Sequence, residues 1–133
     1  MRVSGIDHVN ILTEDLDGTA AFYETLLGLR RTDNAGIAAG RRGAWMRDTA
    51  DNAIVHLVWN DPASDLYKGY EPGKSTNAVH HVAFGCQGFE AMRAKLEQMG
   101  TEYRVNDRQF GGLRQIFLID PNAVNLELNF AGD

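Results

Sequence analysis

The chain has 133 residues, of which 44% are hydrophobic, and its formal net charge is −5. This length suits a single domain with a sizeable core, and the composition excludes global disorder. The negative charge argues against nucleic-acid binding, and no apolar run approaches the length of a membrane span. A single cysteine, Cys86, excludes an internal disulfide, and the first residues do not form a signal peptide. We therefore expect a cytoplasmic protein.

The first half of the sequence predicts a βαβββ unit. A strand over residues 3–12 leads into Thr13, Glu14 and Asp15, which offer the oxygen acceptors of a helix N-cap. A helical apolar pattern then ends at Gly28, a good helix terminator. Short strand-like runs follow at residues 29–32, 37–39, 43–47 and 53–59.

The second half repeats this order after a segment rich in turn formers. Residues 61–77 contain Pro62, Gly69, Pro72 and Gly73 without a clear period, which is typical of a linker, lid or binding segment. The repeated unit predicts a strand at 79–86, a helix at 88–99 and strands at 102–105, 113–118 and 124–130. We predict one α+β domain of two βαβββ modules, residues 1–60 and 78–133, joined by residues 61–77.

Each half carries residues that can bind a metal ion at matched points. His8 and His81 lie in the opening strands, while His56 and Glu127 lie in the closing strands. Strand alternation turns such residues away from their apolar neighbours, toward the concave side of each sheet. A lone histidine in a strand is usually structural, but recurrence in a repeat favours a metal site. By the same alternation His80 points away from His81, and we treat it as structural.

Imidazole and carboxylate groups suit Zn, Ni, Fe, Mn or Co as a divalent ion. A face of two histidines and one carboxylate leaves positions open for a chelating substrate. The ion can then act as a Lewis acid or hold O₂ beside a catechol.

At these residues the chain resembles the vicinal oxygen chelate superfamily, which includes glyoxalase I, methylmalonyl-CoA epimerase, fosfomycin-resistance transferases and extradiol dioxygenases. The resemblance lies in the Asp7-His8-Val9 opening, the helix end at Gly28, the His80–Phe84 segment, and the Ile119–Asn122 turn before Leu126-Glu127-Leu128. It implies paired modules in a curved, incomplete barrel around a cleft, often within a homodimer. It also implies that His8, His81 and Glu127 bind the metal.

The role that the resemblance implies for His56 differs between the branches of this superfamily. The resemblance to glyoxalase I and the epimerase implies a fourth ligand at this position, usually Glu or Gln. The resemblance to extradiol dioxygenases implies a histidine that handles protons beside the metal. That branch also has a tyrosine ten residues before its ligand glutamate, where this chain has Phe117.

Four other residues are candidates for substrate binding. Arg108 and Arg114 flank a Gly-rich turn and can grip a carboxylate, although a solvated hairpin explains them equally simply. Trp59 can wall a pocket, and Tyr67 can close over a substrate from the long loop. The plainer interpretation is packing along the sheet for Trp59 and surface packing for Tyr67.

The sequence therefore predicts a metal-dependent enzyme of isomerase or lyase type, acting on a small, oxygenated, metal-chelating molecule. His56 and Glu127 are the catalytic candidates, and His56 fits either the fourth ligand or a proton shuttle. The alternatives are an Fe(II) ring-cleaving dioxygenase and a metal-free protein that binds a drug or metabolite.

Overall fold

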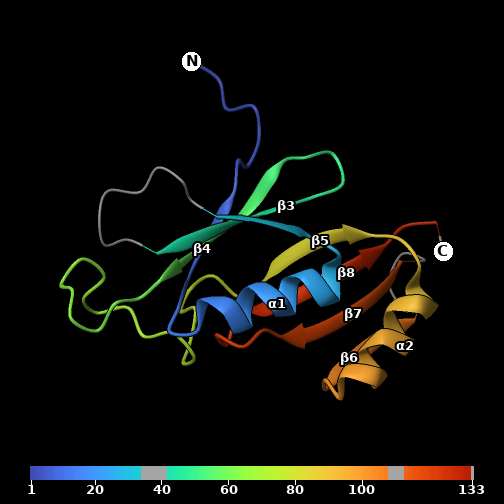
Figure 1. Cartoon of the computed structure of the whole chain (residues 1–133). Coiled ribbons are helices and arrows are strands. Elements are labelled where there is room, and N and C mark those ends of the chain that lie inside the picture. Colours follow the sequence, from blue (N-terminus) through green and yellow to red (C-terminus); the bar gives the residue numbers. More distant parts are fainter. Residues whose placement is uncertain (34–41, 108–112, 133) are drawn as a thin grey trace. The chain divides into compact units, whose positions relative to one another are not determined.

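The computed structural model describes residues 1–33, 42–107 and 113–132 and divides the chain into two compact units, Met1–Pro72 and Gly73–Asp133 (Figure 1). Among these residues each unit has one helix and one four-stranded sheet. The predicted α+β class and the repeated βαβββ order are confirmed. The division falls inside the segment predicted to connect the modules. The arrangement of the modules around a common cleft stays a prediction.

Unit 1, residues 1–72, contains a sheet with one face covered by its helix. Its elements are β1 (Val9–Thr13), α1 (Leu16–Leu27), β2 (Arg30–Asp33), β3 (Gly43–Arg47) and β4 (Ala53–Trp59). The strand order is β1-β4-β3-β2, and the β1–β4 pair is parallel. Because α1 packs against β3 and β4, alternate strand residues are buried beneath it. The buried strand residues on the side covered by α1 are Ile11, Thr13, Ala44, Met46, Val55 and Leu57.

Unit 2, residues 73–133, repeats this plan. Its elements are β5 (Val82–Cys86), α2 (Phe89–Met99), β6 (Tyr103–Asp107), β7 (Arg114–Ile119) and β8 (Asn125–Phe130), in the order β5-β8-β7-β6. On α2, Phe89 is buried and meets Phe130 edge-to-face, with ring centroids 5.3 Å apart. The buried strand residues on the helix-facing side are Ile116, Leu118, Leu126, Leu128 and Phe130.

Both opening strands begin later than the sequence predicts. Pairing starts at Val9, opposite Val55, and at Val82, opposite Leu126. The apolar residues before these points have no ladder partner within the described ranges, and Val79 is 60% exposed. An apolar pattern alone does not show where a neighbouring strand begins. His8 and His81 therefore stand immediately before their strands, and the strand predicted at 37–39 lies outside the described residues.

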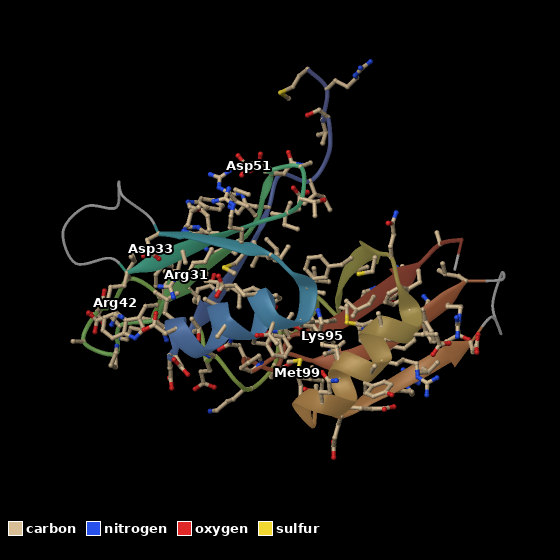
Figure 2. The ribbon with its side chains drawn as sticks, turned by 45° about the vertical axis from the view of Figure 1, so that its right-hand side comes forward. Arg31, Asp33, Arg42, Asp51, Lys95 and Met99 are labelled. Atoms are coloured by element: carbon tan, nitrogen blue, oxygen red, sulfur yellow. The ribbon has the colours of Figure 1, made fainter. Side chains whose placement is uncertain are left out.

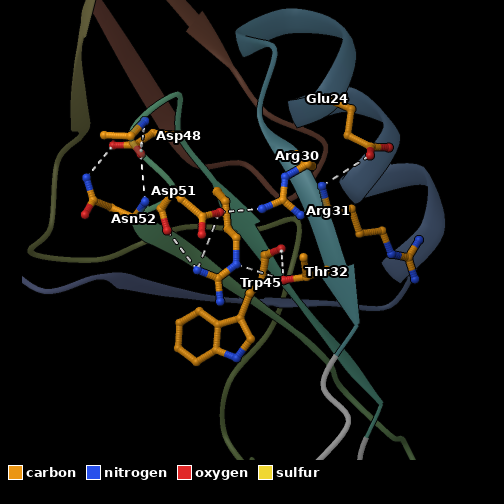
Figure 3. A network of polar contacts seen from close by, with 10 residues as sticks. Glu24, Arg30, Arg31, Thr32, Trp45, Asp48, Asp51 and Asn52 are labelled. Carbon is orange, nitrogen blue, oxygen red and sulfur yellow. Dashed lines mark hydrogen bonds and ion pairs between the residues drawn. The ribbon is translucent and has the colours of Figure 1, made fainter.

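Ion pairs hold the outer strands of unit 1. Arg31 on β2 bonds to Asp17 of α1 and to Asp33, each at 2.8 Å, and Figure 2 shows Arg31 and Asp33 close to Arg42. At the far end of the sheet, Arg30 pairs with Asp51 (Figure 3). These exposed pairs contribute little stability each, but they tie β2 to the helix and to the β3–β4 hairpin.

The helix ends follow the predicted chemistry. Asp15 caps α1, its side chain accepting a hydrogen bond from the Gly18 N–H at 2.9 Å. Gly28 ends α1 in the left-handed conformation, with φ of 66°, and its N–H donates to the Glu24 carbonyl at 3.0 Å. Gly100 ends α2 in the same way. Neither helix in the described part of the chain is long and apolar enough to cross a membrane.

Replacing Gly28 with alanine should lower the free energy of unfolding by about 1 kcal/mol, because an alanine Cβ disfavours the left-handed region. A Cβ at Gly28 would meet nothing within 4 Å, so the cost comes from the backbone alone. Gly85→Ala is the control, since Gly85 lies in a strand outside that region and has equal space. Urea unfolding followed by circular dichroism measures both variants. Equal stability of the two would contradict this account.

Candidate functional site

The open face of unit 1 carries a row of side chains across all four strands. The register aligns Asn10 of β1 with His56 of β4, then Trp45 of β3, then Thr32 of β2. Alternation sets this row opposite the buried residues under α1, as predicted for His56. The Thr32 hydroxyl donates to the Trp45 carbonyl at 3.4 Å, which ties the row together at the β2 edge (Figure 3).

His56 is held from two sides. Its ring stacks on Trp45 with centroids 4.0 Å apart and planes 9° apart. Asn10 Nδ2 lies 3.1 Å from His56 Nδ1, so the amide donates to this nitrogen and the ring hydrogen sits on Nε2. With the amide turned so that its oxygen faces Nδ1, the hydrogen moves to Nδ1 and Nε2 carries the lone pair. The orientation of the Asn10 amide therefore corresponds to one of two His56 tautomers, with either a hydrogen or a lone pair on Nε2.

His8 stands beside this pair. Its Nδ1–H donates to Asp7 Oδ2 at 2.6 Å, and its ring meets Trp45 edge-on at 4.8 Å and His56 at 6.0 Å. A carboxylate on one imidazole nitrogen is the usual arrangement behind a metal-binding histidine, because it fixes the tautomer that leaves Nε2 free to coordinate. Asp7 thus prepares His8 for the predicted role.

The matching residues of unit 2 lie in contact. His81 Nε2 is 3.4 Å from Glu127 Oε2. His80 Nδ1 is 3.0 Å from His81 Nδ1, so His80 turns toward His81. The prediction that His80 points away from it is wrong, because both residues precede β5 and strand alternation does not apply to them. A hydrogen on His81 Nδ1, donated to His80, leaves the Nε2 lone pair beside Glu127.

A set of three amides, which we call the amide ladder, positions Glu127. Gln115 Nε2 donates to Glu127 Oε1 at 2.8 Å and to Asn129 Oδ1 at 2.9 Å, while Asn106 Nδ2 donates to Gln115 Oε1 at 2.7 Å. Glu127 Oε1 is therefore engaged, and Oε2 faces His81. Gln115 was not predicted as a site residue, although it lies two residues before Phe117 and so shares its face.

Glu127 opens into a hollow of about 380 Å³ within unit 2. Phe117 pairs directly with Glu127 across β7 and β8, so its ring forms part of the wall beside the carboxylate. The lining residues are His80, His81, Arg104, Phe117, Leu118, Ile119, Asn125, Leu126 and Glu127. A small molecule can therefore reach Glu127 and His81 from the open side of the sheet.

The donors of unit 2 fit a metal ion. Two ligand atoms about 2.0–2.2 Å from one ion, in tetrahedral or octahedral arrangement, lie about 2.8–3.6 Å apart. The 3.4 Å between His81 Nε2 and Glu127 Oε2 falls in that interval. No group of three or more His, Cys, Asp or Glu side chains that could hold an ion is found within either unit over residues 1–33, 42–107 and 113–132. Each unit thus offers a pair of donors, and their convergence on one ion stays a prediction.

Two of the predicted substrate-binding residues, Arg114 and Trp59, lie on the helix-covered face of their own sheets, opposite the donor pair of the same unit. Arg114 shares the helix-facing side of β7, bonds to Glu90 at 2.7 Å and Asp107 at 3.1 Å, and covers the Phe89 ring at 3.6 Å. This arrangement favours a structural role. Trp59 shares the Leu57 face of β4, opposite His56, with the Arg42 guanidinium over its ring at 5.4 Å.

Tyr67 and Arg108 belong to connecting segments. Tyr67 lies half-buried in a run of turns, where its carbonyl accepts from the Tyr70 N–H at 3.1 Å. Arg108 lies outside the described residues. Substrate contact by either stays a prediction.

With this geometry, the chain belongs to the glyoxalase/bleomycin resistance protein/dioxygenase superfamily, whose family model matches residues 5–128. The resemblance predicted from the sequence is confirmed. Glyoxylase I 4 of Arabidopsis thaliana is 26% identical over 133 aligned residues, which cover 96% of this chain and 71% of that protein.

Solved structures share the fold. A glyoxylase/bleomycin resistance protein/dioxygenase domain from Frankia sp. EAN1pec superimposes with a TM-score of 0.74 at 17% identity, covering 97% of this chain and 98% of that one. The fosfomycin resistance protein FosX from Listeria monocytogenes, in complex with Mn(II) and sulfate, gives a TM-score of 0.68 at 15% identity, with 98% and 94% covered. At these identities the likeness concerns the fold.

Acid should destabilise the metal-free protein through His56. Burial of the ring, and to a lesser degree nearby His8, lowers the pKa of His56 below its ordinary value of 6.5. Between the lowered pKa and 6.5 the unfolded chain binds more protons, so the free energy of unfolding falls as the pH decreases through this window. Above pH 6.5 the His56 ring is neutral in the folded and the unfolded chain, so its protonation no longer lowers the free energy of unfolding.

Urea unfolding of chelator-treated protein at a series of pH values measures this dependence. His56→Gln should flatten the curve between neutral and mildly acidic pH, whereas His80→Gln, which removes an exposed histidine from the other unit, should leave the contribution of His56 in place. A curve unchanged by His56→Gln would contradict the assignment.

Proposed function

We propose that this chain is a divalent-metal-dependent enzyme that acts on a small, oxygenated, metal-chelating substrate with isomerase or lyase chemistry. The ligands are His8, His81 and Glu127, and His56 is the fourth ligand or the residue that moves a proton. The observation that carries the proposal is the 3.4 Å approach of His81 Nε2 to Glu127 Oε2, with the other ring nitrogen and the other carboxylate oxygen both engaged. The proposal also includes a homodimer and a cytoplasmic location.

The side chains behind the ligands support this proposal. Asp7 occupies His8 Nδ1, and His80 occupies His81 Nδ1, so in both histidines Nε2 is the nitrogen directed to the ion. Gln115 engages Glu127 Oε1, which favours binding through Oε2 alone. Three donors prepared in this way suit Zn, Ni, Fe, Mn or Co.

A bound ion would supply Lewis-acid polarisation of a substrate oxygen, and the proton transfers would fall to His56 and Glu127. With the Asn10 amide oxygen at Nδ1, the neutral His56 ring has its lone pair on Nε2, which can accept a proton and return it from the imidazolium; with the amide nitrogen there, the Nε2–H can donate a hydrogen bond to the substrate. Stacking on Trp45 holds the ring in place for this exchange. Glu127 would accept a proton on Oε2 after leaving the ion, while the Gln115 hydrogen bond holds Oε1 in place.

The position of Phe117 favours the isomerase or lyase interpretation over ring cleavage. Its side chain faces the hollow directly across from Glu127, where the resemblance to dioxygenases implies a tyrosine hydroxyl. A phenyl ring cannot donate a hydrogen bond to bound oxygen or catecholate. The Fe(II) dioxygenase therefore remains the second candidate, and the metal-free binding protein is the third.

Metal analysis of the full chain tests the proposal. Protein purified without chelators should bind Zn, Ni, Mn or Co stoichiometrically and gain thermal stability from it. His81→Ala and Glu127→Gln should each weaken binding more than about 100-fold, because loss of a mere partner of a ligand already costs 10–100-fold. Glu102→Gln, an exposed carboxylate before β6, is the matched control. Absence of bound metal and of any thermal shift would contradict the proposal and favour the metal-free binding protein.

Gln115→Leu should lower metal affinity about 10–100-fold without removing any ligand. The substitution removes the hydrogen bond that fixes Glu127 Oε1, so Oε2 is no longer held toward His81. Calorimetric titration with Zn measures the change, and Gln98→Leu, on the exposed face of α2, controls for the loss of an amide. Unchanged affinity in Gln115→Leu would show that the amide ladder has no influence on the ion.

A further inference from the structure

The hollow of unit 2 contains a cation that the proposed metal chemistry does not use. Arg104 of β6 faces Phe117 of β7, which faces Glu127 of β8, so the three side chains form one row on the open face. The Arg104 guanidinium lies 4.9 Å from the centre of the Phe117 ring. Arg104 is exposed, and it lines the hollow together with Glu127 and His81.

Arg104 differs from the other arginines described in unit 2 in its lack of an acidic partner. Arg93 pairs with Glu90 at 3.5 Å, and Arg114 pairs with Glu90 and Asp107. No acidic side chain within the described ranges pairs with Arg104, whose contact is with the Phe117 ring. In a chain of net charge −5, an arginine that keeps its donors available inside a hollow has the character of an anion-binding residue.

The spacing of the strands sets the distance between the two ends of the row. Neighbouring strands lie about 4.8 Å apart, so the backbones at Glu127 and Arg104 are about 10 Å apart, with the apolar Phe117 between them. A molecule whose oxygens reach an ion at Glu127 would lay its carbon chain over Phe117 and present its far end to Arg104. One guanidinium fork matches one planar carboxylate, in geometry and in charge.

We propose that Arg104 binds a carboxylate of the substrate, so that the enzyme selects molecules carrying metal-chelating oxygens at one end and a carboxylate at the other. This inference rests on the proposed metal site, since the ion beside Glu127 fixes the position of the chelating end of the substrate. It replaces Arg114, whose fork is already taken by Glu90 and Asp107, as the residue that recognises the carboxylate.

A pair of hydroxamates tests the assignment. Succinic acid monohydroxamate offers two adjacent oxygens to the metal and a carboxylate at the other end; its primary amide has the same shape without that charge. The full chain loaded with Mn(II) should bind the acid about tenfold more tightly than the amide, as measured by calorimetry. Arg104→Gln should abolish this preference, and Arg104→Lys should retain part of it. Affinity for Mn(II) and for the amide should stay unchanged in both variants.

Arg93→Gln, which removes an arginine paired with Glu90 on α2, should keep the full preference. Equal affinity of the wild type for acid and amide, or a preference that persists in Arg104→Gln, would overturn the assignment while leaving the metal site intact. Failure to bind Mn(II) at all would overturn the proposed function, and this inference with it.

Discussion

The approach of His81 Nε2 to Glu127 Oε2 is the contact on which the account depends. An imidazole and a carboxylate at this distance form either an ion pair or two ligands of one ion. The surrounding hydrogen bonds favour ligands. Gln115 holds the far oxygen of the carboxylate, and His80 holds the far nitrogen of the imidazole, so the two remaining donor atoms are directed at the same point. In unit 2, α2 covers the opposite face of the sheet, so the face that carries Glu127 is not covered by the helix.

Both modules place a possible metal ligand in their last strand and hold it with an amide side chain, but the residues differ. His56 in unit 1 and Glu127 in unit 2 occupy the last strand of their modules, and in each an amide from the open face engages one of the two possible ligand atoms. Asn10 engages His56, and Gln115 engages Glu127. The aromatic residue beside the possible ligand also differs between the units: Trp45 stacks on His56, whereas Phe117 lies beside Glu127. The repeat thus conserves the placement of donors and allows the chemistry beside them to vary.

Much of this organisation was predictable from local sequence. The order of elements, the helix ends at Gly28 and Gly100, and the face occupied by His56 follow from periodicity and turn chemistry. The start of β1 was not predictable, because it depends on where β4 supplies a partner. The ion pairs of Arg114 and the amides around Glu127 join residues from different elements, and only the strand register and the packing of α2 on the sheet bring them together. His80 shows the same limit, since alternation fails outside the ladder.

X-ray absorption spectroscopy of the zinc-loaded full chain tests the central claim most directly. If both pairs of donors meet at one ion, the spectrum should show at least two imidazole ligands together with oxygen donors, and His8→Ala should remove one imidazole just as His81→Ala does. A single imidazole, unaffected by His8→Ala, would contradict the claim that both halves of the chain bind the same ion.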